Sequence, residues 1–417
     1  MKKALVISAI ASSQGKTLLT MALLHHYKTK VRPYKCGPDF IDPQFHEKIA
    51  QTPSINLDGY MMNEEQVKWI FDKYMDKDVA ICEGVMGFYD GMDKGSSAYD
   101  IAKILNLPSL LILDASGSYI TIAAILNGMT SFREDNTIKA VVLNKVSSKM
   151  HFDLVKKHIE LECEDVVVVG WIEKNLNTLN SRHLGLDLQD LDSDNLDLIT
   201  KDVLKYIDMT LLESVMDIDV QKVDKYPFKE LVKKDEKCVV VYDKNFSFLY
   251  HDNLEYLKEV YDEVVLVDST KDEPIPKDAH KVIIVGGYIE TDESYERVEN
   301  SRKFRDSLAL HVEAKKEVYA ECAGLIYLGK KIDDKEMSGI LDIEFKLGEK
   351  RERLGYYEAL DYDTLEIQKG HAFHYSFITK APKAKIGLYK TTKKTIKDGG
   401  YKKDNIIATY LHTMWRV

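Results

Sequence analysis

The stretch ALVISAIASSQGKTLLTMALLHHY, residues 4–27, decides the fold of the first half of the chain. It begins with a short apolar run, which is typical of a strand buried on both faces. It ends with the apolar segment LLTMALLHHY, which can form a helix. A strand, a tight loop and a helix N-terminus in this order gather backbone N–H groups and the positive end of the helix dipole, which together bind phosphate. We therefore predict a phosphate-binding loop at SSQGKT, residues 12–17.

This loop supplies candidate ligands for a nucleotide. Lys16 would reach the terminal phosphates of ATP, and Thr17 would hold Mg²⁺ through its hydroxyl group. The loop departs from the usual GxxxxGK[ST] pattern, because Ile10 stands at the first glycine and Ser13 at another position that is often glycine. GKT alone is a common chance match, but its place between a strand and a helix favours a nucleotide site. The predicted nucleotide-binding residues of the loop are Ser12, Ser13, Gln14, Gly15, Lys16 and Thr17.

Four acidic residues strengthen this prediction. Glu83 ends an apolar run, where a carboxylate can bind Mg²⁺ directly or through water. Asp39, Asp42 and Asp90 lie in turns rich in Gly and Pro, where an Asp usually accepts only local backbone hydrogen bonds. Four acids at the strand ends and loops of a nucleotide-binding sheet favour metal and phosphate binding instead. The predicted Mg²⁺ ligands are Thr17, Asp42, Glu83 and Asp90, and Asp39 is a candidate substrate contact.

Length and composition restrict the class of protein. A chain of 417 residues predicts two domains. Acidic residues exceed basic ones by 68 to 58 without a long basic run, which disfavours general electrostatic binding to nucleic acid or to an anionic membrane. No apolar run approaches the roughly 18 residues of a membrane span. The five widely spaced cysteines include no CxxC pair and have no zinc-ligand spacing, so we expect a soluble protein in the reducing cytoplasm.

The order of the apolar runs predicts the architecture. Along the first half, short apolar runs alternate with helix-like segments, as in a parallel sheet covered by helices. An acidic amphipathic stretch and a Lys-rich stretch follow, and a second series of strands runs from CVVVYD (238–243) to NIIATYLH (405–412). We predict an α/β fold with an ATP-binding domain over 1–216, a linker over 217–236 and a second domain over 237–417.

Motifs along nearly the whole chain resemble those of the cobyrinic acid a,c-diamide synthases, a family of ATP-dependent, glutamine-hydrolysing amidases of corrinoid precursors. GKT is a weak motif, whereas GPDFIDPQFH (37–46) and SRHLGL (181–186) are unusual strings. The others are NLDGYMM, EGVMGFYDG, VVLNKV, NFSFLYHDNLEYL, GGYIE, ECAGLIYLG, GHAFHYS and TYLH. The resemblance implies a P-loop domain like that of dethiobiotin synthetase, followed by a class I glutamine amidotransferase-like domain. It also implies ATP and Mg²⁺ as cofactors, and L-glutamine and a corrinoid polycarboxylate as substrates.

The same resemblance suggests further binding residues in the first domain. Asn144 of VVLNKV matches the residue that reads adenine, although an Asn at a strand end can also cap a turn. Arg182 of SRHLGL is a candidate for a bidentate contact with a substrate carboxylate, against the alternative of a surface ion pair. Tyr34, Lys35 and His183 are weaker candidates for the substrate site.

A cysteine interrupts the stretch VYAECAGLIYL, residues 318–328. A nucleophile at a strand-to-helix corner is held in a strained turn, and the N–H groups that follow can form an oxyanion hole. Cys322 fits this role as the residue that attacks the amide of glutamine, although a buried Cys by itself is usually inert packing. His412, just past the last strand, is its expected partner, which would lower the thiol pKa and protonate the departing ammonia.

The third member of this amidotransferase site stays open. Members of the family usually carry Glu where Ala372 stands in GHAFHYS, so that role cannot be transferred to this chain. His371 and His374 are retained in the same motif. They would either shape the domain interface or substrate pocket, or serve as structural histidines.

Two domains with two chemistries imply a coupled reaction, in which ammonia released at Cys322 displaces phosphate from an acyl phosphate made with ATP. One alternative is the same chemistry on hydrogenobyrinic acid or nickel sirohydrochlorin, and another is amidation of a different polycarboxylate or of a lipid-linked acid. A third is a partition-type regulatory ATPase with an inactive amidotransferase domain, which commonly carries Lys where this chain has Ala11. The sequence does not decide the oligomeric state, and a homodimer is one candidate.

Overall fold

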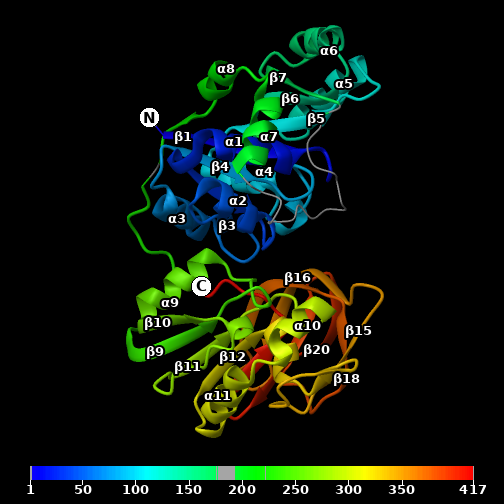
Figure 1. Ribbon diagram of the computed structural model, residues 1–417. Coiled ribbons are helices and arrows are strands. Elements are labelled where there is room, and N and C mark those ends of the chain that lie inside the picture. Colours follow the sequence, from blue (N-terminus) through cyan, green and yellow to red (C-terminus); the bar gives the residue numbers. More distant parts are fainter. Residues whose placement is uncertain (1, 175, 177–192, 221, 417) are drawn as a thin grey trace. The chain divides into compact units, whose positions relative to one another are not determined.

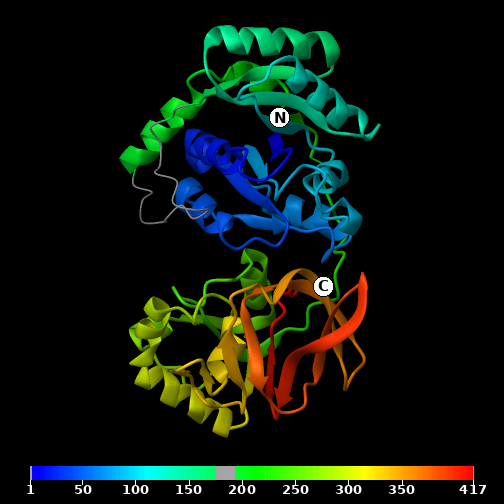
Figure 2. The same cartoon turned by 90° about the vertical axis from the view of Figure 1, so that its right-hand side faces the viewer.

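The computed structural model describes residues 2–174, 176, 193–220 and 222–416. The chain divides into two compact units, Met1–Pro227 and Phe228–Val417, and each is built from strands and helices (Figures 1 and 2). Both ends of the predicted linker contribute strands, because β8 (Asp217–Ile218) pairs with the first strand of the chain and β9 begins at Lys234. The exact domain limits stay a prediction.

The first unit is organised around one sheet, in the order β3-β2-β4-β1-β5-β6-β7. The neighbours in this order are parallel, whereas β8 is antiparallel to β1. Strands β2 and β4 are buried along their whole length. The apolar run VAIC of β4 is typical of a strand covered on both faces, whereas β2, VRPYKC, also buries Arg32 and Lys35. The strands are β1 (Lys2–Ala9), β2 (Val31–Cys36), β3 (Ile55–Leu57), β4 (Val79–Glu83), β5 (Ser109–Asp114), β6 (Ile138–Val146) and β7 (Val167–Glu173).

Helices pack on this sheet through apolar side chains. Leu19 and Leu23 of α1 belong to one buried cluster with Phe45 of α2 and Ile199 of α7.

No helix among the described residues is long and apolar enough to cross a membrane. The helices are α1 (Lys16–Tyr27), α2 (Asp42–Ala50), α3 (Glu64–Tyr74), α4 (Ala98–Leu105), α5 (Ile120–Ser131), α6 (Lys149–Glu162), α7 (Ser193–Leu204) and α8 (Met209–Ser214), with 3₁₀ turns at Lys28–Lys30 and Met92–Lys94.

The second unit contains a nine-stranded sheet in the order β10-β9-β11-β12-β21-β20-β19-β16-β17 and a four-stranded sheet in the order β14-β13-β15-β18. From β10 to β21 the large sheet is parallel, and from β21 to β17 it is antiparallel. The strands are β9 (Lys234–Val241), β10 (Tyr261–Val267), β11 (Lys281–Ile284), β12 (Glu317–Glu321), β13 (Lys331–Ile332), β14 (Lys335–Glu336), β15 (Glu344–Leu347), β16 (Arg353–Asp361), β17 (Ile367–His374), β18 (Ser376–Lys380), β19 (Ile386–Lys390), β20 (Lys393–Lys403) and β21 (Ile406–Thr409).

Four α-helices and one 3₁₀ turn accompany these strands in the described residues. They are α9 (His251–Val260), α10 (Asp292–Glu299), α11 (Arg302–Glu313), α12 (Ala323–Leu328) and the turn Ser269–Lys271. Strands β12 and β21 are parallel neighbours, with Glu321 opposite Thr409. The segments that follow two parallel neighbours leave the sheet at the same edge, so the residues after β12 and β21 lie close together.

A backbone bridge joins the last strand of the large sheet to the segment after β21. The N–H of His371 on β17 donates to the carbonyl oxygen of His412 at 2.9 Å, and the N–H of His412 donates back to His371 at 2.8 Å. The antiparallel part of the sheet therefore curls until β17 meets the continuation of β21.

Candidate active sites

The phosphate-binding loop joins β1 to α1. Gly15 has φ 102°, and Ser13 has φ 61°, a backbone conformation that is costly for a residue with a side chain. A Cβ atom at Gly15 would lie 2.5 Å from Nδ2 of Asn144, so this position has no space for a side chain. The structure therefore requires glycine at position 15. Ser13 adopts a strained backbone conformation that glycine would adopt without strain.

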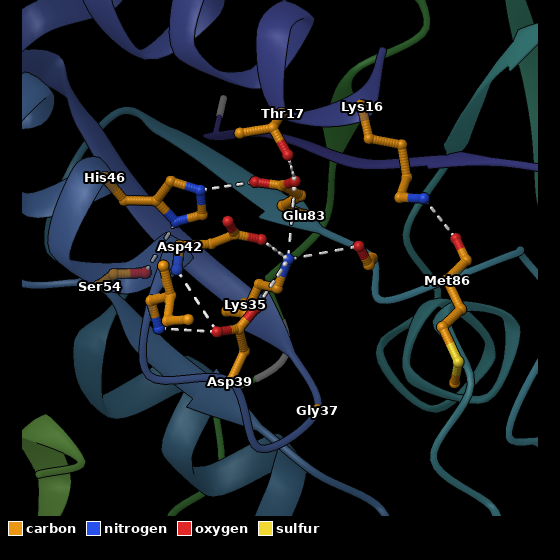
Figure 3. A network of polar contacts seen from close by, with 12 residues as sticks. Lys16, Thr17, Lys35, Gly37, Asp39, Asp42, His46, Ser54, Glu83 and Met86 are labelled. Atoms are coloured by element: carbon orange, nitrogen blue, oxygen red, sulfur yellow. Dashed lines mark hydrogen bonds and ion pairs between the residues drawn. The ribbon is translucent and has the colours of Figure 1, made fainter. Parts of the chain in front are cut away.

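Lys16 is the first residue of α1, and its side chain is buried. Its Nζ donates to the carbonyl oxygens of Met86 and of Ala11, the latter at 3.3 Å (Figure 3). Burial lowers the pKa of Lys16, and the neighbouring Lys35 lowers it further. A poorly hydrated ammonium group gains strongly from an anionic partner, as expected for a lysine that binds phosphate.

A second buried lysine holds together three of the predicted acids (Figure 3). Lys35 on β2 lies opposite Glu83 on β4. Its Nζ contacts the carboxylate of Asp42 and lies 3.6 Å from an oxygen of Asp39 and from Oε1 of Glu83. Burial alone would lower the pKa of Lys35, but these carboxylates, led by Glu83, raise it above its usual value. Lys35 is therefore charged and is the counter-ion of the cluster.

Glu83 occupies the centre of this network. Its Oε1 accepts a hydrogen bond from Oγ1 of Thr17 at 2.7 Å, and its Oε2 lies 2.6 Å from Nε2 of His46. Burial alone would raise the pKa of Glu83, but Lys35, together with hydrogen bonds from His46 and Thr17, lowers it below its usual range. His46, whose Nδ1 in turn contacts Ser54 at 3.1 Å, was not predicted, because nothing in a helical His signals a partner on a distant strand.

The geometry fits Mg²⁺ at Thr17 and Glu83, whose oxygens are already in contact. Mg²⁺ binds through one or two protein oxygens together with phosphates and water, and it would neutralise phosphate charge here. Asp42 is paired with Lys35, and burial together with Glu83 raises its pKa to about 6. Asp90 accepts a hydrogen bond from the N–H of Gly87 at 2.8 Å. No cluster of three or more His, Cys, Asp or Glu with metal-site geometry occurs among the described residues, so Mg²⁺ ligation by Thr17, Asp42, Glu83 and Asp90 stays a prediction.

Asn144 supports the phosphate loop from β6. Its Nδ2 donates to the carbonyl oxygen of Gln14 at 2.8 Å, and its Oδ1 accepts the N–H of Lys145 at 2.7 Å. The Asn144 amide therefore stabilises the backbone of the phosphate-binding loop and of its own strand end. Adenine recognition by Asn144 stays a prediction. Arg182 and His183 lie outside the described residues.

Cys322 forms the corner between β12 and α12. Its φ of 46° and ψ of −100° are strained for a residue with a side chain, which costs about 1–3 kcal/mol. Its N–H donates to the carbonyl oxygen of Thr409 at 2.8 Å, which anchors the corner to β21. Burial, with Glu290 and Glu321 as lesser causes, raises the pKa of the Cys322 thiol. The sequence analysis expected His412 to lower the pKa of this thiol, but the described surroundings raise it. The thiol therefore needs a base that removes its proton.

His412 supplies an imidazole near that corner. Its Nδ1 lies 3.3 Å from Oε2 of Glu321, the residue before Cys322. A Cβ atom at Gly286 would lie 2.1 Å from Cε1 of His412, so the backbone of the loop after β11 packs directly against the imidazole. Sequence reasoning selected Cys322 and His412 but gave no role to Glu321, whose contact with His412 depends on the pairing of β12 with β21.

The two histidines of GHAFHYS, His371 and His374, have different surroundings from His412. Burial, together with the neighbouring Arg353, lowers the pKa of His374 to about 3, so this imidazole is neutral. Its ring stacks on Tyr410 with 3.8 Å between ring centroids. These contacts favour the structural alternative for His374, whereas His371 meets His412 through its backbone.

Gly286→Ala should reduce glutamine hydrolysis at least about tenfold, because the added methyl group would overlap the imidazole of His412 and displace it. Synthesis from ammonium salt should be unchanged. The measurement is glutamate release beside ammonia-dependent product formation. Gly128→Ala is a matched control, because a Cβ atom there meets nothing within 4 Å. Full glutaminase activity in Gly286→Ala would contradict this placement of His412.

Two family models match the two parts of the chain. Residues 3–182 match the model of an AAA domain, and residues 237–416 match that of a CobB/CobQ-like glutamine amidotransferase domain. The fold prediction of a P-loop domain followed by a class I amidotransferase-like domain is thereby confirmed.

Relatives of similar length extend the match over the whole chain. A cobyrinate a,c-diamide synthase of Caldanaerobacter subterraneus subsp. tengcongensis is 34% identical over 99% of this chain and 95% of its own. Those of Saccharolobus solfataricus and Streptococcus sanguinis are 35% and 33% identical over 98% of this chain, and over 97% and 95% of their own. The chain belongs to the cobyrinate a,c-diamide synthase family.

Proposed function

We propose that the protein uses ATP and glutamine to amidate the a and c acetate carboxylates of cobyrinic acid. The observation that carries the proposal is the presence of two chemically complementary sites in one chain. The first is the phosphate-binding loop with Lys16 and the Thr17–Glu83 contact. The second is the strained corner of Cys322 beside the Glu321–His412 pair. The first suits carboxylate activation, and the second suits the release of ammonia.

In the first half-reaction, Cys322 attacks the side-chain amide of glutamine. His412 takes the thiol proton and returns it to the departing nitrogen, so that ammonia leaves and a glutamyl thioester remains. Water then cleaves the thioester to glutamate and regenerates the thiol. The raised pKa of the buried thiol makes proton transfer to a base a necessary part of this step.

In the second half-reaction, an oxygen of the substrate carboxylate attacks the γ-phosphorus of ATP. ADP leaves, and an acyl phosphate forms. Lys16 stabilises the negative charge that spreads over the transferring group, and Mg²⁺ held at Thr17 and Glu83 would neutralise the phosphates. Ammonia then attacks the acyl carbon, phosphate leaves, and a proton is lost to give the amide. An unactivated carboxylate is a poor electrophile, which is why the reaction consumes ATP.

The remaining residues complete the proposal. Arg182 and His183 would bind the substrate, together with Asp39, whose carboxylate also accepts the N–H of Ile41 at 2.7 Å. We place the enzyme in the cytoplasm, with domains over 1–216 and 237–417, and we take a homodimer as the assembly to test. A partition-type regulatory ATPase is disfavoured, because such a protein has no use for a strained nucleophile with a buried base.

The decisive experiment is a mass assay on three substrates side by side: cobyrinic acid, hydrogenobyrinic acid and nickel sirohydrochlorin. Replacement of one carboxyl OH by NH₂ lowers the mass by about one unit, and two amidations lower it by about two. We expect ATP- and glutamine-dependent double amidation of cobyrinic acid. Preference for one of the other two would correct the substrate, and failure on all three would refute the tetrapyrrole assignment.

A further inference from the structure

A buried carboxylate lies beside the imidazole of the second site. Oε2 of Glu321 is 3.3 Å from Nδ1 of His412, and both side chains are almost completely buried. We propose that Glu321 positions His412 for proton transfer with Cys322, as the third member of the glutamine-hydrolysing site. This inference rests on the proposed roles of Cys322 and His412 and assigns a role to a residue that the sequence prediction left without one.

The carboxylate of Glu321 is fixed from its other side. Its Oε1 accepts hydrogen bonds from the hydroxyl of Tyr319 at 3.0 Å and from Nε1 of Trp415 at 3.1 Å. Two donors on Oε1 hold the plane of the carboxylate and leave Oε2 directed toward His412. A functional side chain needs such a supporting layer to keep the geometry that proton transfer requires.

This arrangement selects one tautomer of the imidazole. A carboxylate can only accept, so Nδ1 of His412 carries the proton that faces Oε2 of Glu321. The other ring nitrogen, Nε2, is then the basic atom that can accept the thiol proton of Cys322. When Nε2 becomes protonated, the imidazole is positively charged, and the carboxylate of Glu321 stabilises that charge.

Glu321 and Cys322 are adjacent in the sequence but have different roles in the proposed glutamine-hydrolysing site. Glu321 is the last residue of β12, and Cys322 is the corner that follows, so their side chains leave the backbone in different directions. Glu321 is also one of the groups that raise the pKa of the Cys322 thiol. Its negative charge therefore opposes formation of a neighbouring thiolate, and any benefit to catalysis has to pass through His412.

Two other residues of the second unit, Ala372 and Glu290, are less suited to this role. Ala372 is fully buried on β17 and has no polar side-chain atom. Glu290 also raises the pKa of Cys322, but its Oε2 accepts the backbone N–H of Ile289 at 2.9 Å. The carboxylate of Glu321, in contrast, lies 3.3 Å from Nδ1 of His412.

The test compares Glu321→Gln with the matched variant Glu317→Gln, at the exposed start of the same strand, where the carboxylate pairs with Lys281. We expect Glu321→Gln to lower kcat for glutamine hydrolysis at least about a hundredfold, because its amide can donate to Nδ1 and invert the tautomer. The KM for glutamine should change less than about threefold, since the substrate contacts are untouched. Glu321→Asp should recover part of the rate. Glutamine hydrolysis by Glu317→Gln, and ammonia-dependent synthesis by both variants, should stay close to wild type.

A spectroscopic measurement separates positioning from a merely structural role. With ¹⁵N-labelled histidine, His412 of the folded protein should show a proton on Nδ1, and Glu321→Gln should move it to Nε2. If Glu321→Gln does not fold, Trp415→Phe removes one donor to Oε1 and keeps the carboxylate. We expect this variant to lower kcat several-fold with KM unchanged.

The outcomes distinguish this inference from the proposed function. Glutamine hydrolysis within threefold of wild type in Glu321→Gln, or a wild-type His412 protonated on Nε2 alone, would overturn the positioning role. If Cys322→Ser abolishes hydrolysis in the same assay, the proposed function stands while the role of Glu321 fails. Retained hydrolysis in Cys322→Ser would instead refute the proposed nucleophile.

Discussion

Replacing Cys322 with serine should abolish glutamine-dependent amidation and leave amidation from ammonium salt intact at raised pH. A serine hydroxyl has a far higher pKa than the reference thiol at about 8.5, so it is a poor nucleophile at a site arranged for a thiol and an imidazole. The loss should be at least about a thousandfold in glutamate release. ATP consumption with ammonia as donor should continue, because the phosphate-binding loop is unaltered.

His412→Ala should give the same pattern as Cys322→Ser. A nucleophile and its base act as one unit, so the double variant should be no worse than either single variant. Cys238→Ser is the matched control, since Cys238 is also buried but lies within β9. Loss of ammonia-dependent synthesis in a folded Cys322→Ser protein would show that the corner cysteine does more than generate ammonia.

Lys16→Ala should abolish synthesis with either nitrogen donor and leave glutamine hydrolysis measurable. The ammonium group of Lys16 is the charge that stabilises the transferring phosphoryl group, and its loss should lower ATP-dependent product formation at least about a hundredfold. Folding should change little, because in the described part of the chain the Lys16 ammonium group donates to two loop carbonyl groups, those of Ala11 and Met86. ADP formation and glutamate release, measured in the same samples, test both statements.

The exposed Lys30 at the end of the first 3₁₀ turn provides the matched control for Lys16. Lys30→Ala removes the same charge from the same unit and should keep full activity. Retention of full synthase activity by Lys16→Ala would refute the assignment of the ATP site.

Local sequence patterns predicted the elements that carry the chemistry. The apolar run before Ser12 and the helix-forming segment after Thr17 are a strand and a helix, because periodicity and loop chemistry are properties of neighbouring residues. Cys322 likewise stands at a strand-to-helix corner, as the break in its apolar run indicated. The family resemblance added the order of the two domains, which the matches to known families confirm.

Partners far apart in the sequence could not be predicted in the same way. The contact of His46 with Glu83 depends on how α2 packs on β2, the neighbour of β4 in the sheet. The contact of Glu321 with His412 depends on the pairing of β12 with β21. Neither His46 nor Glu321 has a local signal of its partner. Asn144 illustrates the same limit, since its contact with Gln14 arises from the approach of β6 to the phosphate loop.

The backbone bridge between His371 and His412 has a consequence for folding kinetics. It joins segments that are distant along the chain, and contacts of this kind form slowly because a long loop must close first. The imidazole of His412 therefore takes its place only after β16, β17 and the strands between them and β21 have paired. During refolding, the return of glutaminase activity should lag behind the return of secondary structure, and the amide hydrogens of His371 and His412 should gain protection from exchange together with that activity.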